Sequence, residues 1–282
     1  MSLFSGLESL GLGKIKEKEV YDKEEPAAAG GNKEQAQTKQ KNEADVLFDK
    51  TYVCPVCGKE FTSKTIRTGR NKLVAQDLDL RAKYDTADVS KYDPVVCGTC
   101  GFAALSKFFK PLSSAQEKLI KENISNNFKG IKEPEGAYSY DDAIMRYKLV
   151  LASTVVKGAK NSEKAFVCLK MAWVYRGKAE SLPDDTQNKD AVLKELQDAE
   201  IECLTNAYEG FNSAFSQEAF PMCGMDESTV TYLVAELARR VGKLEEAGRW
   251  ISQILVSRSA SDRLKDRARE VKALIGKEKD GK

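Results

Sequence analysis

Two short cysteine turns constrain this chain more than any other feature. One spans Cys54 to Gly58, the other Cys97 to Gly101, and both read C-x-x-C-G. Glycine has no Cβ, so the backbone can turn tightly after each pair and point N–H groups at the sulfurs. Four thiolates suit a closed tetrahedral zinc site with no position open to a substrate. The spacing therefore predicts one structural Zn²⁺, ahead of rubredoxin-like iron, held by Cys54, Cys57, Cys97 and Cys100.

Two alternative roles for these cysteines stay open at the level of sequence. They could be two unrelated pairs of reduced cysteines, or a redox dithiol. A redox C-x-x-C is expected between a strand and a helix of a βαβ unit, and neither turn has that context. The remaining cysteines, Cys168, Cys203 and Cys223, are expected in or near helix packing as small apolar residues.

Composition narrows the class of protein. With 282 residues the chain can form one or two domains, each with its own core. A net charge of +2 creates no overall field that would require nucleic acid or a membrane as partner. The seven cysteines lack the dense framework of a small secreted domain, which favours a reducing compartment and predicts a cytoplasmic location. No signal peptide or membrane-spanning run is recognisable, so no membrane span is expected.

The sequence contains no histidine. This removes the commonest general base, the Ser-His and Cys-His nucleophile pairs, and every metal site that needs an imidazole. Enzymes can use Glu, Lys or Tyr instead, but no catalytic constellation of these is recognisable here. We therefore expect a protein that is not an enzyme.

The order of the chain predicts four segments. The first combines an apolar tail of 13 residues with a polar linker, residues 14–45, that we expect to be disordered. We expect the tail to pack on its own protein, with a docking peptide for a partner as the alternative. The predicted divisions are the tail and linker at 1–45, a zinc-ribbon unit at 46–110, a helical domain at 111–276 and a polar tail at 277–282.

The zinc-ribbon unit is expected to contain short antiparallel strands. Residues 59–68 suit a strand after the first cysteine turn, with residues 72–78 as its hairpin partner, and Val95 and Val96 lead into the second turn. Such a unit has a small core, so metal binding would stabilise it. The apolar residues between Phe102 and Phe109 are expected to dock it against the first helices.

The rest of the chain predicts helices. Ser114 with Glu117 and Ser139 with Asp142 match the pattern of capping boxes at two helix starts. Gly158, Pro221 and Gly224 provide breaks between helices. The predicted helices span residues 114–128, 140–156, 162–179, 189–215, 228–241, 244–257 and 262–275.

Part of this helical region is similar to tetratricopeptide repeats. Residues 140–151 resemble the second helix of a repeat, and residues 231–255 a whole repeat, with Ala235 and Ala247 at small positions and Gly242 at the turn. The usual Trp and Pro positions hold Thr231 and Ser259. The fold class predicted is mainly α, a zinc ribbon followed by helical hairpins of an α-solenoid, with a plain helical bundle as the alternative.

The combination resembles a known bacterial family, the domain of unknown function 2225. Matching features are the Asp77-x-Asp79 pair, Tyr92-Asp93, and Val96 followed by the second cysteine turn and Phe102-Ala103-Ala104. The resemblance covers residues 46–275, with Leu80 and residues 87–90 departing from the usual pattern. It implies the fold and zinc ribbon described above and implies no reaction.

Three classes of function follow. The first is a non-enzymatic zinc-binding scaffold that presents its helical-repeat surface to a peptide or protein. The second is a nucleic-acid-binding protein using the basic segment 59–72, with Lys64, Arg67, Arg70 and Lys72 as phosphate-binding candidates; a solvated charged hairpin would look the same. The third is a thiol-redox or other enzyme. A carboxylate cluster of Asp77, Asp79 and Asp93 could serve one, although such residues commonly pair with neighbouring Arg and Lys.

Overall fold

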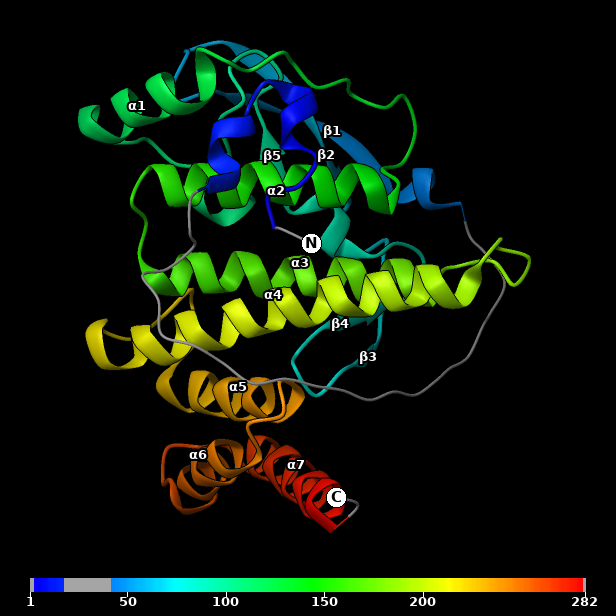
Figure 1. The fold of residues 1–282 in the computed structure, drawn as a ribbon, viewed down its shortest axis with the longest axis vertical. Coiled ribbons are helices and arrows are strands. Elements are labelled where there is room, and N and C mark those ends of the chain that lie inside the picture. The colour runs from blue at the N-terminus through cyan, green and yellow to red at the C-terminus, as the bar shows by residue number, and fades with distance from the viewer. Residues whose placement is uncertain (1–2, 18–41, 281–282) are drawn as a thin grey trace.

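The helices stack one upon another along the longest axis of the molecule. The computed structural model describes residues 3–17 and 42–280. In Figure 1 strands β1, β2 and β5 lie at the top with α1, and α2, α3, α4 and α5 follow in turn down to α6 and α7, with β3 and β4 beside α4 and α5. Each helix from α2 onward packs on the next. The helices are α1 (Ser114–Ile120), α2 (Tyr140–Val156), α3 (Asn161–Glu180), α4 (Lys189–Gln217), α5 (Glu227–Arg240), α6 (Leu244–Val256) and α7 (Asp262–Asp280).

Local signals set the ends of these helices. The capping box of Ser139 and Asp142 is present at the start of α2, as predicted. The box at α1 is formed by Ser113 with Gln116, one residue before the predicted pair. A π-helical turn, η6 (Lys121–Ser125), continues α1. Asp226 caps α5 by accepting a hydrogen bond from the Thr229 N–H at 2.7 Å, which satisfies one of the free donors of the first turn.

The pair α5–α6 forms the predicted helical hairpin. Gly242 turns the chain between the two helices with φ 79°, a left-handed conformation that favours glycine. Ala235 and Ala247 are both fully buried, so the two helices approach closely. Trp250 of α6 packs edge-on against Phe215 of α4, with 4.9 Å between ring centroids. The mainly α fold of stacked helical hairpins is therefore confirmed.

Three pairs of antiparallel strands precede the helices. They are β1 (Leu47–Val53) with β2 (Glu60–Ile66), β3 (Leu73–Gln76) with β4 (Ala82–Tyr84), and β5 (Pro94–Val96) with β6 (Ala103–Leu105). The predicted hairpin between residues 59–68 and 72–78 is wrong. Each cysteine turn is itself the tip of a hairpin, because it joins β1 to β2 or β5 to β6.

The ribbon unit is attached to the helices by the second cysteine hairpin. The four residues from Phe102 to Leu105 are almost completely buried in the main apolar core. The Ala103 N–H donates a hydrogen bond to Ser153 Oγ of α2 at 3.1 Å. The same apolar core contains the cysteines of both turns and residues of every helix from α2 to α7. Strand β6 therefore belongs to the ribbon and packs directly against the helical stack.

The first residues of the chain are folded onto the helical stack, as expected for the apolar tail. They form two 3-10 turns, η1 (Leu7–Leu10) and η2 (Gly13–Glu17). A third, η3 (Glu43–Val46), leads into β1. The predicted linker is therefore structured at both ends, and its residues 18–41 lie outside the described residues. The buried side chains of this amino-terminal segment are Leu3, Phe4, Leu7, Leu12 and Ile15.

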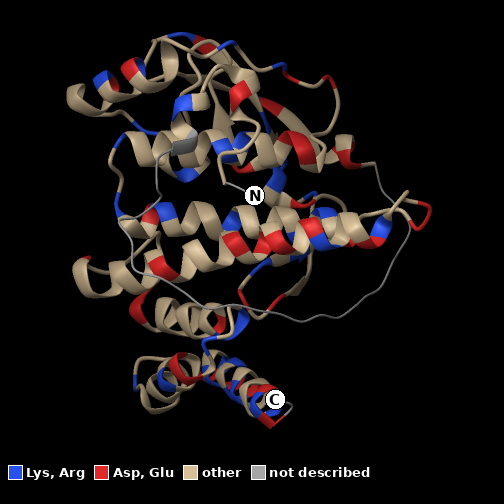
Figure 2. Ribbon diagram, viewed as in Figure 1, with Lys and Arg blue, Asp and Glu red and all other residues tan. Residues whose placement is uncertain are grey.

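Charged side chains of both signs are spread over the helices. Figure 2 shows acidic and basic residues interleaved along α7 and on α4. Within the described part of the chain, no helix is long and apolar enough to cross a membrane.

Candidate metal centre

The two cysteine turns have the same backbone geometry. In the first, the Cys54 N–H donates to Lys59 O at 3.0 Å and the Gly58 N–H donates to Cys54 O at 2.9 Å. In the second, the Cys97 N–H donates to Phe102 O at 2.9 Å and the Gly101 N–H to Cys97 O at 2.9 Å. The two turns therefore present their cysteines as matched halves of one site.

The strands bring the four sulfurs together. Cys54 Sγ and Cys100 Sγ are 3.5 Å apart, and Cys57 Sγ and Cys97 Sγ are 3.6 Å apart. All four sulfurs lie within 4.8 Å of one another. A tetrahedral site with Zn–S bonds of about 2.3 Å needs sulfurs separated by about 3.8 Å. The arrangement therefore fits a single tetrahedral ion, and the residues that would hold it are the four predicted from the sequence.

Hydrogen bonds among the thiols shift the pKa values of Cys97 and Cys100 in opposite directions. Hydrogen bonds from Cys100 and Cys54 lower the pKa of the Cys97 thiol, and the backbone N–H groups of Cys100 and Thr99 lower it further. The pKa of Cys100 is raised because its proton is shared with the sulfurs of Cys54 and Cys97 and because the residue is buried. One thiolate thus suppresses ionisation of its neighbours. A bound metal ion would supply the positive charge that lets all four ionise.

The second turn is packed tightly against the chain that follows α1. Gly101 has φ 74°, and a Cβ built there would lie 2.7 Å from ring atoms of Phe128. A side chain at this position would therefore collide with the ring as well as strain the backbone. Gly58, with φ 71°, has nothing within 4 Å of such a Cβ. The first turn is open on the side where the second is enclosed.

The remaining cysteines lie away from this centre. Cys168 and Cys203 are fully buried between helices, and burial raises the pKa of both thiols. Cys223 is half-buried, and its thiol donates to Ser162 O at 3.3 Å. These positions agree with the predicted packing role.

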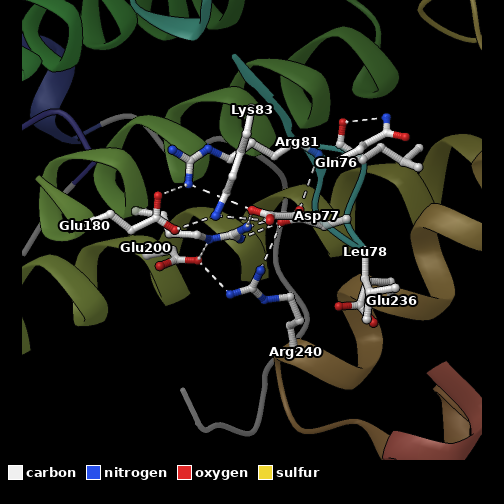
Figure 3. Close-up of polar contacts among 12 residues, drawn as sticks. Gln76, Asp77, Leu78, Arg81, Lys83, Glu180, Glu200, Glu236 and Arg240 are labelled. Atoms are coloured by element: carbon white, nitrogen blue, oxygen red, sulfur yellow. Dashed lines mark hydrogen bonds and ion pairs between the residues drawn. The ribbon is translucent and has the colours of Figure 1, made fainter. Parts of the chain in front are cut away.

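The three carboxylates weighed as an enzymatic cluster are paired with cations. Asp93 Oδ2 lies 2.5 Å from Lys170 Nζ. Asp77 and Asp79 sit in the turn that joins β3 to β4, and Figure 3 shows how residues of three helices surround this turn. Arg176 of α3 contacts Asp77 Oδ2 at 2.9 Å and Asp79 Oδ2 at 2.5 Å. Arg240 of α5 contacts Asp79 Oδ2 at 3.1 Å.

This network attaches the β3–β4 hairpin to the helices. Glu200 of α4 bridges the same two arginines, with both contacts at 2.8 Å. Arg81 of the hairpin reaches Glu180 of α3 at 2.9 Å. Asp79 is completely buried. Burial raises the pKa of its carboxyl, but Arg176 and Arg240 outweigh burial and hold that pKa well below its usual range. The carboxylates therefore act as structural anchors.

The four phosphate-binding candidates do not lie together. Lys64 is buried on β2 and pairs with Asp49 at 3.4 Å. Lys72 is exposed just before β3. Arg67 and Arg70 follow β2, where they line an open hollow with Phe48 of β1. Residues 59–72 are thus split between two hairpins. Phe48, which lies outside that segment, lines the hollow together with Arg67 and Arg70.

A receptor site for the amino-terminal segment was not predicted. Lys148 of α2 is largely buried, and its Nζ donates to Ser5 O at 2.6 Å and contacts Ser5 Oγ at 3.2 Å. The Lys129 N–H donates to Leu10 O at 3.0 Å. A Cβ at Gly11 would lie 1.8 Å from Asn127 O. In the sequence only the apolar spacing of the tail pointed to this contact, and nothing marked Lys148 as its partner.

These observations define a protein with a zinc-ribbon-like motif, in which four cysteines could hold one metal ion, and a stacked helical domain. The chain belongs to the family described as an uncharacterized protein conserved in bacteria (DUF2225), which matches residues 47–275. No curated protein and no solved structure matches the chain. The amino-terminal segment lies outside the matched range, whereas Lys148, Lys129 and the four cysteines lie inside it.

Proposed function

We propose that the protein is a non-enzymatic scaffold, built on a structural Zn²⁺, whose α2 surface receives an apolar peptide. The observation that carries this proposal is the docked amino-terminal segment. A stretch that is not part of the family-matched range buries five apolar side chains against that range. A surface that accommodates one such peptide has the shape and chemistry to accept another from a partner protein.

The receptor residues support peptide recognition through backbone contacts. Among the described residues, Lys148 forms no ion pair with a carboxylate, and its contacts are to Ser5. Burial lowers the pKa of its ammonium, so the group needs oxygen acceptors on the peptide it covers. Burial also raises the pKa of Glu202 on α4, and the Leu3 N–H partly offsets this. A buried cation and a half-buried acid thus face the carbonyl and N–H groups of one peptide.

The metal would support this surface indirectly. The ion would hold the two cysteine hairpins together, and β6 of the second hairpin packs on α2 beside the peptide. A closed four-thiolate site offers no position for a substrate, which favours a structural role over thiol-redox chemistry. We extend the proposal to a cytoplasmic protein whose partner contributes an apolar segment.

A peptide-binding experiment tests the proposal. The full chain carrying Phe4→Asp and Leu7→Asp should release its own segment, because both side chains are buried. A fluorescein-labelled peptide of residues 1–17 should then bind this variant, as measured by fluorescence anisotropy. It should bind the wild type far more weakly, because a tethered competitor has an effective concentration of about millimolar.

Matched controls isolate the receptor and the metal. The same peptide carrying Leu7→Asp should not bind, and Lys148→Ala in the released variant should weaken binding. A zinc chelator should abolish it. If the released variant stays folded but shows no binding even at millimolar peptide, the α2 surface is not a peptide receptor and the proposal is wrong.

A further inference from the structure

One end of the β1–β2 hairpin combines an exposed aromatic ring with two arginines. Phe48 of β1 exposes 38% of its surface, which is unusual for a phenylalanine in this fold. The guanidinium of Arg67 lies over its ring, 5.7 Å from the centroid. Phe48, Arg67, Thr68 and Arg70 together line an open hollow on the surface. We refer to these four residues as the Phe48 hollow.

Strand register explains why residues from two segments meet there. Phe48 is opposite Thr65 in the ladder, and the Arg67 N–H extends the ladder to Val46 O at 2.7 Å. Residues two apart on a strand share a face, so Arg67 lies on the same face as Phe48. The Arg70 N–H donates to Arg67 O at 3.3 Å, which turns Arg70 back toward the hairpin.

The described residues do not neutralise the cations around the hollow. Among the described residues, no carboxylate forms an ion pair with Lys50, Arg67 or Arg70. Arg67 Nε donates to Leu47 O at 2.8 Å, which holds its guanidinium beside the ring. By contrast, Lys64, on the opposite face of the hairpin, is paired with Asp49. The positive charge on the Phe48 face is therefore available to an anionic ligand.

A second aromatic residue continues the same face. Tyr52 lies four residues after Phe48 on β1, and Lys50 Nζ, between them, lies 5.0 Å from the Tyr52 ring centroid. The Tyr52 ring itself packs on Phe61 and Phe109, so Phe48 is the ring on this strand that is open to a base. Bases stack on aromatic rings and on arginine planes, and cations bind the phosphates between them. A base in a duplex has its faces covered by its neighbours, so this surface suits an unpaired strand.

We propose that the Phe48 hollow and the adjoining face of β1 bind single-stranded nucleic acid. Phe48 would stack on a base, and Arg67 and Arg70 would contact flanking phosphates. This site is separate from the peptide surface on α2, so a failure of either proposal would leave the other unaffected.

Fluorescence anisotropy tests this site with the zinc-loaded full chain. The probes are fluorescein-labelled 12-nucleotide single strands of mixed sequence, one RNA and one DNA. Arg67→Glu/Arg70→Glu should weaken binding more than tenfold, and Phe48→Ala should weaken it about fivefold or more, as expected for a lost stacking contact. Phe48→Tyr, which keeps an aromatic ring, should bind as tightly as the wild type. The double variant should also make the plot of log affinity against log salt shallower by about 1.4, because two phosphate contacts are lost.

The control is Arg263→Glu/Lys272→Glu on α7. It makes the same change in charge at exposed cations that have no ion pair among the described residues. Circular dichroism would confirm that every variant remains folded. The proposal is overturned if no single strand binds at 50 mM salt, or if the control weakens binding as much as Arg67→Glu/Arg70→Glu. It is also overturned if a mononucleotide, a phosphopeptide or an anionic vesicle binds the hollow as tightly as the 12-nucleotide strand does.

Discussion

At the scale of single residues, the buried Asp79 is an electrostatic anchor between the β3–β4 hairpin and the helices. It is completely buried and contacts Arg176 and Arg240 at once. Burial of a carboxylate is costly, and the two guanidinium groups compensate for it. Removal of its charge would leave both arginines facing an uncharged group. We therefore expect its substitution to cost more than the loss of a surface ion pair.

Asp79→Asn is expected to lower the free energy of unfolding by about 3–5 kcal/mol, the range for breaking a buried ion pair. Urea denaturation at pH 7 measures this. The pKa of Asp79 in the folded protein lies below its unfolded value, so its stabilisation is complete above about pH 4 and declines as the pH falls further. The wild type should therefore lose stability below pH 4 more steeply than Asp79→Asn.

The control is Asp141→Asn, which breaks the exposed pair with Lys178 and should have little effect. Equal denaturation midpoints for Asp79→Asn and the wild type at pH 7 would show that the network contributes no net stability.

Gly11 gives a second prediction at this scale. It has φ 84°, and a Cβ there would lie 1.8 Å from Asn127 O. Gly11→Ala should detach the amino-terminal segment, because backbone strain alone costs about 1–2 kcal/mol and the collision adds to it. Gly13→Ala is the matched control, since a Cβ there makes only an ordinary contact at 3.7 Å. Hydrogen exchange of residues 7–17 should rise in the first variant and stay unchanged in the second. Unchanged exchange in both would contradict the close contact.

At the scale of elements, the sequence predicted those helices and strands whose position is set by neighbouring residues. It did not predict those set by contacts between distant parts of the chain. Helix α2 begins where predicted because Ser139 and Asp142 cap its first turn, and it ends where predicted, just before Gly158. The four cysteines could be grouped because metal ligation requires all of them at one point. The partner of β2 was predicted wrongly. The cysteine turn pairs β2 with β1, whereas Gly69 and Arg70 suggested a turn that would pair residues 59–68 with residues 72–78. The contacts of Asp79 join residues about 100 and 160 positions apart, and no local pattern indicates them.

The cysteine hairpins predict metal stoichiometry. Purified protein should contain one zinc ion per chain, as measured by elemental analysis, because four sulfurs lie within 4.8 Å of one another. Cys57→Ser should reduce metal affinity by more than the roughly 10–100-fold typical of changes to residues beyond the ligands. Cys223→Ser should retain full metal content, since that thiol contacts Ser162 O instead. An iron–thiolate absorption spectrum, or folded protein without metal, would contradict the zinc assignment.

At the scale of the whole molecule, the metal centre and the helices share one apolar core. Cys97, Cys100 and β6 belong to the same cluster of buried residues as α2. Disturbance of the ribbon should therefore spread into the nearest helix. It should weaken with distance along the stack, because each helix packs chiefly on its neighbours.

Removal of the metal should reveal this gradient. With a zinc chelator present, hydrogen exchange should rise in the two cysteine hairpins, residues 46–66 and 94–105, and to a smaller degree in α2. The β3–β4 hairpin, which the Asp79 network attaches to the helices, and α5, α6 and α7 should keep their protection. The physical reason is that β6 packs on α2, where the Ala103 N–H donates a hydrogen bond to Ser153 Oγ. Exchange that rises in the ribbon alone, with no change around Ile144, would show that the two parts are energetically independent.

The placement of the two tryptophans gives this protein a convenient optical asymmetry. Trp173 lies within α3 and Trp250 against Phe215, and the sequence has no other tryptophan. Intrinsic fluorescence excited at the indole band therefore originates entirely from the helical layers. Trp173→Phe would leave Trp250 of α6 as the one fluorescent indole, and Trp250→Phe would leave Trp173 of α3. The two variants would therefore report separately on the far end and on the middle of the helical stack, with no indole signal from the cysteine hairpins.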